Sequence, residues 1–311
     1  MHSSDRALVD PMAAVRAYLA AEKSDNTRRA YKTDWADFIA WADTVNLISM
    51  PAEPATVARY LAQLADNGRK ASTIQRRVAA IRAIHKAAGH EPPTNAEGVK
   101  ATMRGIRRSK GTKPTRKAPA TAELLHQVLN FLPENLSGLR DRAVLLIAFA
   151  AALRRSELVD LKVNDIERRP RGIVLQIASS KTDQEGRGEL IPVPNGRELK
   201  PVNALDAWLE AAGITEGPIF REVDRHGRVG TAAICDRTVA RIIQRTCKAA
   251  GLEPKLFGGH SMRAGFVTSA LDRQVDPFKI MGISRHVKVD TLKIYDRREN
   301  GFDDAAGGGF L

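Results

Sequence analysis

A run of eleven apolar residues at 143–153 constrains the fold of this chain more than any other segment. Its centre, VLLIAFAAAL, is apolar on every side of a helix, which predicts a helix buried all round in a globular core. The run is too short for a membrane helix, which needs about 18 apolar residues. With 311 residues, the chain is long enough for about two domains, each with a core that needs no disulfide or metal.

The first third of the chain is typical of a small all-α bundle. Apolar side chains recur at helical spacing in five segments, which we expect near residues 10, 26, 54, 72 and 99. Aromatic residues such as Trp35, Phe38 and Tyr60 lie on the apolar stripes, so we expect them in the core. His85 falls on the same stripe as Ile81 in the fourth segment and is also expected to face inward.

Basic residues concentrate in one part of this region. The whole chain has a net charge of +13, and residues 69–117 hold 14 Lys and Arg against only Glu91 and Glu97. No acid lies between Asp66 and Glu91, so the outward face of the fourth helix is predicted to carry unpaired like charges that favour a bound polyanion. The predicted DNA-binding residues are Arg69, Lys70, Arg76, Arg77, Arg82, Lys86, Lys113, Arg116 and Lys117.

The pattern changes after residue 108. Residues 109–119, SKGTKPTRKAP, lack periodicity and are predicted to be an exposed basic linker. Beyond it we expect helices at 121–132 and 139–161, strands at 173–178 and 190–193 joined by a polar turn, and a third strand at 163–166. After Val202 the chain is expected to be mostly helical, with Val239, Ile242 and Cys247 on one buried stripe.

Composition excludes several classes of protein. Two cysteines, Cys235 and Cys247, cannot build a disulfide framework or a four-cysteine zinc site, and they fit a reducing cytosol. The N-terminus has no basic segment followed by an apolar one, so no signal peptide is predicted. We therefore expect a cytoplasmic protein that has no membrane partner.

The absence of several sequence motifs indicates that, if the partner is a nucleic acid, any chemistry on it runs without a metal. The chain contains no GxxxxGK[ST], GxGxxG or HExxH motif and no acidic cluster, so no cofactor and no metal are predicted. Metal-free attack on a phosphodiester requires arginines for the non-bridging oxygens, groups that transfer protons and a positioned nucleophile.

Residues of these types occur at four places in the second part of the chain. Arg154 and Glu157 lie three apart at the exit of the apolar helix, and Lys181 lies in the turn between two strands. His260 and Arg263 share one face of a helix start, and Tyr295 follows His286 by nine residues. Taken singly, each has an ordinary alternative: a surface ion pair, a solvated turn or a core histidine. Tyr295 stands out because no other tyrosine lies beyond residue 60.

The ordered set resembles the tyrosine recombinase (phage integrase) family, which includes the Cre and Xer recombinases. The segments AALRRSEL, HSMRAG and RHVKVDTLKIY carry the resemblance, and STIQRRVAAIRAIHKAAG is similar to the family's N-terminal DNA-binding domain. Two departures stand out. The family's Thr-Gly before Leu-Arg is Ala151-Ala152, which we interpret as a packing position. The family's Leu-Gly-His run is replaced by Ser284-Arg285-His286, so His286 is assigned by its distance from Tyr295.

The resemblance implies a fold, a mechanism and partners. The fold is mostly α with a small antiparallel sheet: an N-terminal SAM-like bundle (1–108), the linker (109–119), an α+β catalytic domain (120–300) and a flexible tail (301–311). The family mechanism makes Tyr295 the nucleophile that forms a 3′-phosphotyrosyl bond. The other implied roles are phosphate binding by Arg154 and Arg263, proton transfer by His260, protonation of the leaving oxygen by Lys181, a phosphate contact by His286 and support from Glu157. The implied partners are a double-stranded DNA site and a tetramer of the chain on that DNA.

Two other functions remain open at this stage. A type IB topoisomerase has a similar constellation but relaxes supercoils without a second site. A protein on the same fold could also bind DNA without cleaving it. The apolar pair Phe310-Leu311 either docks on a neighbouring protomer or is a frayed end.

Overall fold

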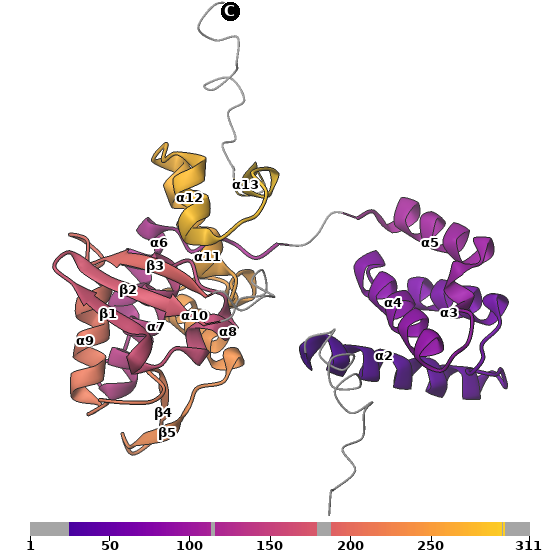
Figure 1. The fold of residues 1–311 in the computed structure, drawn as a ribbon, viewed down its shortest axis with the longest axis horizontal. Coiled ribbons are helices and arrows are strands. Elements are labelled where there is room, and N and C mark those ends of the chain that lie inside the picture. The colour runs from indigo at the N-terminus through magenta and orange to yellow at the C-terminus, as the bar shows by residue number, and fades with distance from the viewer. Residues whose placement is uncertain (1–24, 113–115, 179–187, 294, 296–311) are drawn as a thin grey trace, which may run out of the picture. The chain divides into compact units, whose positions relative to one another are not determined.

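The computed structural model describes residues 25–112, 116–178, 188–293 and Tyr295. The chain divides into two compact units, Met1–Thr115 and Arg116–Leu311 (Figure 1). The predicted first helix near residue 10 and the tail at 301–311 lie outside the described residues. Within the described part of the chain, no helix is long and apolar enough to cross a membrane.

The first unit is helical, as predicted. Its elements are α2 (Asp25–Thr44), α3 (Pro54–Asp66), α4 (Ala71–Ala87), a 3-10 turn (Pro93–Asn95) and α5 (Glu97–Lys110). The core contains the expected aromatic and aliphatic side chains, among them Phe38, Tyr60, Ile74 and Met103. His85 is fully buried: its Nε2 accepts from the Ala52 backbone N–H at 2.9 Å and its Nδ1 lies 2.9 Å from the Ile81 carbonyl. Both ring nitrogens have partners, so this histidine serves the core.

The prediction of an unpaired basic face on α4 is wrong for two of its residues. Arg77 is buried, its Nη1 donates to Tyr60 Oη and pairs with Asp37, and its Nε lies 3.8 Å from an oxygen of buried Asp34. Arg76 pairs with the same Asp34 at 3.1 Å. The carboxylates of Asp34 and Asp37 come from α2, which lies about 40 positions earlier in the chain, so the absence of acids near α4 in sequence did not reveal them. Arg69, Lys70, Arg76, Arg82 and Lys86 are exposed, as the DNA-binding prediction requires.

Replacing Arg77 with alanine is expected to lower the free energy of unfolding of the first unit by about 3 kcal/mol. The change removes a buried guanidinium that contacts Tyr60 and Asp37. It also leaves Arg76 as the charged partner of buried Asp34, and the loss of one partner from a buried cluster of charges is costly. Lys86→Ala, at an exposed position further along the same helix, is the matched control and should leave stability unchanged. Urea unfolding monitored by circular dichroism measures both; equal stability of the two variants would contradict the prediction.

The second unit combines helices with two small antiparallel sheets. One sheet has the order β1-β2-β3 and the other pairs β4 with β5. The elements are α6 (Ala122–Val128), a 3-10 turn (Leu129–Phe131), α7 (Leu136–Ala150), α8 (Arg155–Asp160), a 3-10 turn (Val163–Asp165), β1 (Ile166–Arg169), β2 (Gly172–Ile177), β3 (Glu189–Pro194), α9 (Pro201–Ala211), β4 (Arg221–Val223), β5 (Val229–Ala233), α10 (Asp236–Ala249), a 3-10 turn (Pro254–Leu256), α11 (Ser261–Asp272), α12 (Pro277–Ser284) and α13 (Asp290–Lys293).

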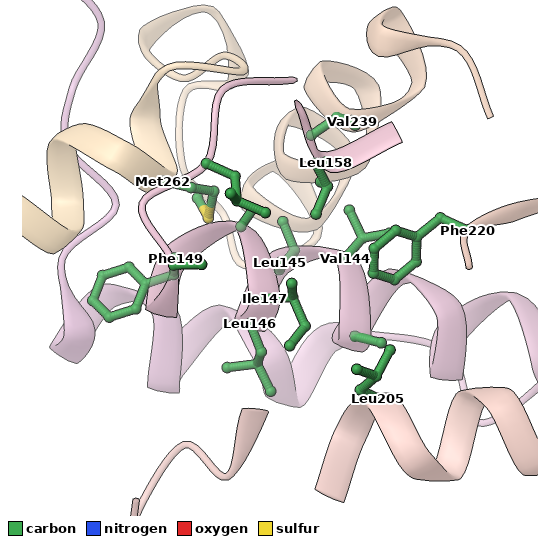
Figure 2. Close-up of a cluster of buried hydrophobic side chains, with 14 of the residues drawn as sticks. Val144, Leu145, Leu146, Ile147, Phe149, Leu158, Leu205, Phe220, Val239 and Met262 are labelled. Atoms are coloured by element: carbon green, nitrogen blue, oxygen red, sulfur yellow. The ribbon is translucent and has the colours of Figure 1, made fainter. Parts of the chain in front are cut away.

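The core of the second unit surrounds α7, as its uniformly apolar sequence predicts. Figure 2 shows Leu158, Val239 and Met262 on one side of this helix and Leu205 on the other. The sheet adds the inward residues of β2 and β3, and the register pairs Ile173 with Val193 across the two strands. Pro192 and Pro194 fit β3 because it is an edge strand, where a missing N–H is tolerated.

Several predicted boundaries differ from the structure. The third strand is β1 (Ile166–Arg169), because residues 163–165 form a 3-10 turn, and the β4–β5 hairpin was not anticipated. Helix α5 continues to Lys110, beyond the expected start of the linker. Ala118 and Ala120 donate backbone hydrogen bonds to Leu256 and Ser261. The segment from residue 116 therefore belongs to the second unit.

The predicted helix at 139–161 is two helices separated by a sharp turn. Helix α7 ends in a Schellman arrangement, in which Leu153 N–H bonds the Ala148 carbonyl and Ala152 N–H bonds the Phe149 carbonyl. Ala152 has a φ of 47°, the left-handed conformation that glycine usually supplies. Our interpretation of Ala151-Ala152 as a packing position is therefore incomplete. Both side chains are buried, but Ala152 also bears backbone strain.

Replacing Ala152 with glycine is expected to raise the free energy of unfolding of the second unit, by at most about 1 kcal/mol. Glycine has no Cβ to strain the left-handed conformation, and this gain exceeds the greater backbone entropy that glycine has in the unfolded chain. Ala151→Gly is the matched control, because Ala151 has a φ of −95° and glycine there should only destabilise. Chemical denaturation measures the difference, and a destabilised Ala152→Gly variant would contradict the assignment of strain.

Candidate active site

Arg154 stands directly after the turn that ends α7 and caps the start of α8. Its Nη1 donates to Glu157 Oε1 at 2.5 Å, and its backbone N–H donates to Glu157 Oε2 at 2.8 Å. The predicted spacing of three residues thus lets one carboxylate fix both the backbone and the side chain of Arg154. Glu157 is buried, whereas the Arg154 side chain keeps 22% of its surface exposed and can meet a ligand.

His260 and Arg263 are placed by the start of α11, where the predicted i, i+3 spacing puts them on one face. Arg263 is 2% exposed and its Nη1 donates to the Ala152 carbonyl at 2.8 Å. The strained turn after α7 therefore orients a second arginine as well as positioning Arg154. Helix α11 also passes close to the backbone of Ala120. Only glycine fits at position 265, because a Cβ there would lie 1.8 Å from the Ala120 carbonyl oxygen.

Tyr295 is brought to His260 by a small apolar cluster. Its side chain packs with Ala264, Val267, Ile280 and Leu292, which come from α11, α12 and α13. The Tyr295 hydroxyl lies 2.8 Å from His260 Nε2. The two residues are 35 positions apart in sequence, and their juxtaposition creates a hydrogen-bonded tyrosine–histidine pair.

His286 also lies next to Tyr295, with ring centroids 5.5 Å apart. Its Nδ1 is 2.8 Å from Ser284 Oγ, so this serine fixes the orientation of the imidazole. The structure thus brings together five of the six catalytic candidates. Lys181 lies outside the described residues, as does Lys113, but the strands β2 and β3 that flank the Lys181 segment are paired as predicted.

Arg285 is a residue of the site to which the sequence analysis gave no role. It is 7% exposed, and its Nη2 donates to Glu157 Oε2 at 2.7 Å. Its Nε lies 3.4 Å from Glu189 Oε2. The available signal was a charged residue in the position where the resembled family has glycine, directly before His286.

The electrostatics of the site keep both histidines neutral. Loss of surrounding water lowers the pKa of His260, and the charges of Arg263 and Arg154 lower it further, although the residue as a whole keeps an exposed surface. The same two causes lower the pKa of His286 to about 4. A neutral imidazole can accept a proton, so His260 can serve as a base toward the hydroxyl that it contacts.

The charged groups of the site respond differently to burial. Burial raises the pKa of Tyr295, although Arg263, Arg116 and Arg154 partly oppose this rise, so the phenol stays protonated at neutral pH. Burial lowers the pKa of Arg263 to about 10, which leaves it charged. Burial would raise the pKa of Glu157, but Arg285 and Arg154 outweigh it and hold this pKa below its usual value. The site therefore combines a protonated tyrosine, two neutral imidazoles and an excess of positive charge.

No metal centre accompanies this arrangement in the described part of the chain. None of its groups of three or more His, Cys, Asp or Glu side chains could hold a metal ion. The fold and the site together define a two-domain protein whose second domain gathers a tyrosine, two histidines and three arginines. These residue types are typical of an enzyme that uses a tyrosine to attack a phosphodiester.

Comparison with known proteins gives the family. The model described as "Phage integrase family" matches residues 120–300, and the one described as "Phage integrase, N-terminal SAM-like domain" matches residues 16–92. The chain belongs to the phage integrase family of tyrosine recombinases, which are DNA strand-exchange enzymes.

Curated relatives agree with this assignment, and solved structures share the fold. An integrase/recombinase xerD homolog of Selenomonas ruminantium is 41% identical over 295 residues, covering 93% of this chain and 86% of the relative. The recombinase cre of Escherichia phage P1 is 25% identical over 293 residues, covering 88% and 84%. A lambda integrase dimer bound to a COC′ core site shares the fold with a TM-score of 0.64 at 19% identity, covering 92% of this chain and 76% of that one.

Proposed function

We propose that this chain is a site-specific recombinase that cleaves and rejoins DNA through a 3′-phosphotyrosyl intermediate on Tyr295. The observation that carries the proposal is the 2.8 Å contact between the Tyr295 hydroxyl and His260 Nε2, beside buried Arg263 and partly exposed Arg154. A protonated phenol needs a base, and this neutral imidazole is within reach of its proton.

The chemistry follows from these positions. Tyr295 Oη bonds to phosphorus while its proton passes to His260 Nε2, and the bond to the 5′-oxygen breaks. Arg154 and Arg263 bind the non-bridging oxygens, whose charge increases in the transition state. His286 contacts a phosphate oxygen, and Lys181 donates the proton to the leaving 5′-oxygen. Attack by a 5′-hydroxyl of a second duplex reverses these steps and completes strand exchange.

The covalent intermediate makes an external energy source unnecessary. The phosphotyrosyl diester replaces a DNA diester, so the bond energy is retained and neither ATP nor a metal is required. We further propose that four copies of the chain act on paired duplexes, and that the protein is cytoplasmic and associates with the nucleoid when bound to DNA.

The first unit is proposed to hold the duplex through its exposed cations. The candidates on and before α4 are Arg69, Lys70, Arg76, Arg82 and Lys86, while Arg77 serves the fold of the unit. Arg116 and Lys117 follow the unit boundary, and Lys117 Nζ also donates to the Lys255 carbonyl at 2.5 Å. Exposed lysines and arginines bind the phosphates of the backbone, so the affinity for duplex DNA should fall steeply with salt concentration.

Covalent capture tests the proposed function and requires no target sequence to be chosen in advance. The protein is incubated with a pool of nicked duplexes of randomised sequence, in which cleavage next to the nick releases a short strand that diffuses away. Adducts that survive denaturation are collected, their DNA is sequenced and the modified peptide is identified. The expected result is a defined sequence linked to Tyr295. Relaxation of supercoiled plasmid by the monomer without sequence preference would favour a topoisomerase, and binding without an adduct would favour a DNA-binding protein.

A further inference from the structure

Arg285 is a buried cation in the second unit to which the mechanism above assigns no role. It joins three parts of the structure, because it contacts Glu157 on α8 and Glu189 on β3 and lies directly before His286. Its Nη2 also approaches the Ala152 carbonyl at 3.5 Å, the same oxygen that accepts from Arg263. Arg285 therefore touches a partner of each proposed phosphate-binding arginine.

The backbone at Arg285 is held in an unfavourable conformation. The residue ends α12 with a φ of 56°, in the left-handed region. Glycine adopts this region without strain, whereas an arginine there persists only when its surroundings hold it. The ion pairs of the guanidinium are the contacts that hold it, so this side chain is retained at a position where glycine would fold more easily.

The charge of Arg285 alters what Glu157 does to Arg154. Glu157 is 4% exposed and binds both guanidinium groups: Oε1 accepts from the Arg154 side chain, and Oε2 accepts from Arg285 as well as from the Arg154 backbone N–H. With Arg154 as its sole charged partner, the carboxylate would neutralise that guanidinium. With Arg285 present, the Glu157 carboxylate is shared between two guanidinium groups and neutralises Arg154 less, while the more exposed Glu189 offsets part of the charge that Arg285 adds.

We propose that Arg285 is a positioning residue for the recombination reaction, which keeps Arg154 and Arg263 oriented and charged for the scissile phosphate by binding Glu157 and the Ala152 carbonyl. The inference rests on the proposed function, because it assumes that these two arginines bind the phosphate. This role of Arg285 differs from a purely structural one in one respect. If Arg285 acts through the two phosphate-binding arginines, its effect on the rate must depend on the negative charge of the diester.

A substrate without that charge separates the two roles. In a methylphosphonate linkage a methyl group replaces one non-bridging oxygen, so the diester is neutral and needs less cationic stabilisation. The captured target duplex is prepared with either a phosphodiester or a methylphosphonate at the scissile position, and the rate of adduct formation is measured on both. The variants are Arg285→Gly, which suits the left-handed backbone, and Arg285→Lys, which keeps the charge.

Three further variants calibrate the measurement. Arg154→Ala removes a phosphate ligand directly and should recover on the neutral substrate. His260→Ala removes the base and should be impaired on both substrates. Arg273→Gly removes an arginine from the end of α11, where it forms an exposed pair with Glu123, and should leave both rates unchanged. Thermal unfolding of each variant shows whether the fold is intact.

The expected result is a loss of about 10- to 100-fold for Arg285→Gly on the phosphodiester, the usual effect of removing a residue that supports a ligand. On the methylphosphonate, the loss should shrink to a few-fold, and Arg285→Lys should be less impaired on the phosphodiester. A wild-type rate for Arg285→Gly, or an equal loss on both substrates, would overturn the inference. Failure of the wild-type protein to form any adduct would instead overturn the proposed function.

Discussion

Replacing Tyr295 with phenylalanine is expected to abolish the covalent protein–DNA adduct, a loss of roughly 10⁵-fold or more. The hydroxyl is the proposed nucleophile, and removal of a nucleophile leaves only the contribution of binding and charge stabilisation. The rest of the site should survive, because the Tyr295 ring packs in the apolar cluster of α11–α13 and phenylalanine preserves that packing. Denaturing gel electrophoresis after incubation with the captured duplex measures the adduct.

Tyr31→Phe is the control for this result. Tyr31 lies in α2 of the first unit, and its replacement by phenylalanine removes the same hydroxyl group at a position far from the site in sequence. This variant should form the adduct at the wild-type rate, while Tyr295→Phe should bind the duplex with unchanged affinity. Undiminished adduct formation by Tyr295→Phe would show that another residue is the nucleophile and that the contact with His260 has a different purpose.

Arg263→Lys should slow adduct formation by about 10³-fold. The guanidinium is almost fully buried and donates from Nη1 to the Ala152 carbonyl, and its other donors are proposed to bind the phosphate. An ammonium is a point charge without the planar fork, so it cannot serve the carbonyl and two phosphate oxygens in the same geometry. Because lysine keeps the charge, the defect should lie in the rate of cleavage and not in duplex affinity.

Single-turnover cleavage kinetics and equilibrium binding separate these two quantities for Arg263→Lys. Arg273→Lys, the same exchange at the exposed end of α11, should change neither. A variant that cleaves as fast as wild type would show that Arg263 acts only as a buried support of the turn after α7. A variant that unfolds at lower temperature and also loses affinity would place its effect on the fold of the second unit.

Much of the helical fold follows from local periodicity. The stripes in α3 and α10 predict both the helices and their buried residues, because a packed helix repeats its apolar face every three to four positions. In α4 the stripe predicts the helix and buried Ile74, Ile81 and His85, but not the burial of Arg77. The break after α7 could not be predicted in this way, since the apolar run continues through it and alanine, not glycine, occupies the turn. The β4–β5 hairpin also gives no signal, because most of its residues are exposed and do not alternate.

The site is less accessible to sequence reasoning than the fold. Spacings within one helix predict that Glu157 can orient Arg154 and that His260 and Arg263 share a face. Contacts between distant segments need the resemblance to a known family, as for His260 and Tyr295. The role of Arg285 was missed because its carboxylate partner Glu157 lies 128 positions away. The pairing of Arg77 with α2 was missed for the same reason.

The two left-handed turns at Ala152 and Arg285 determine where the stability of this protein can be increased without loss of activity. Each places a residue with a Cβ where glycine would be relaxed, and both turns adjoin the arginines of the site. A stabilising exchange at Ala152 removes only a methyl group and keeps the backbone carbonyl that binds Arg263, so the protein can gain stability there without losing a contact of the site. At Arg285 the same exchange removes a guanidinium, so the more relaxed protein would be the slower enzyme.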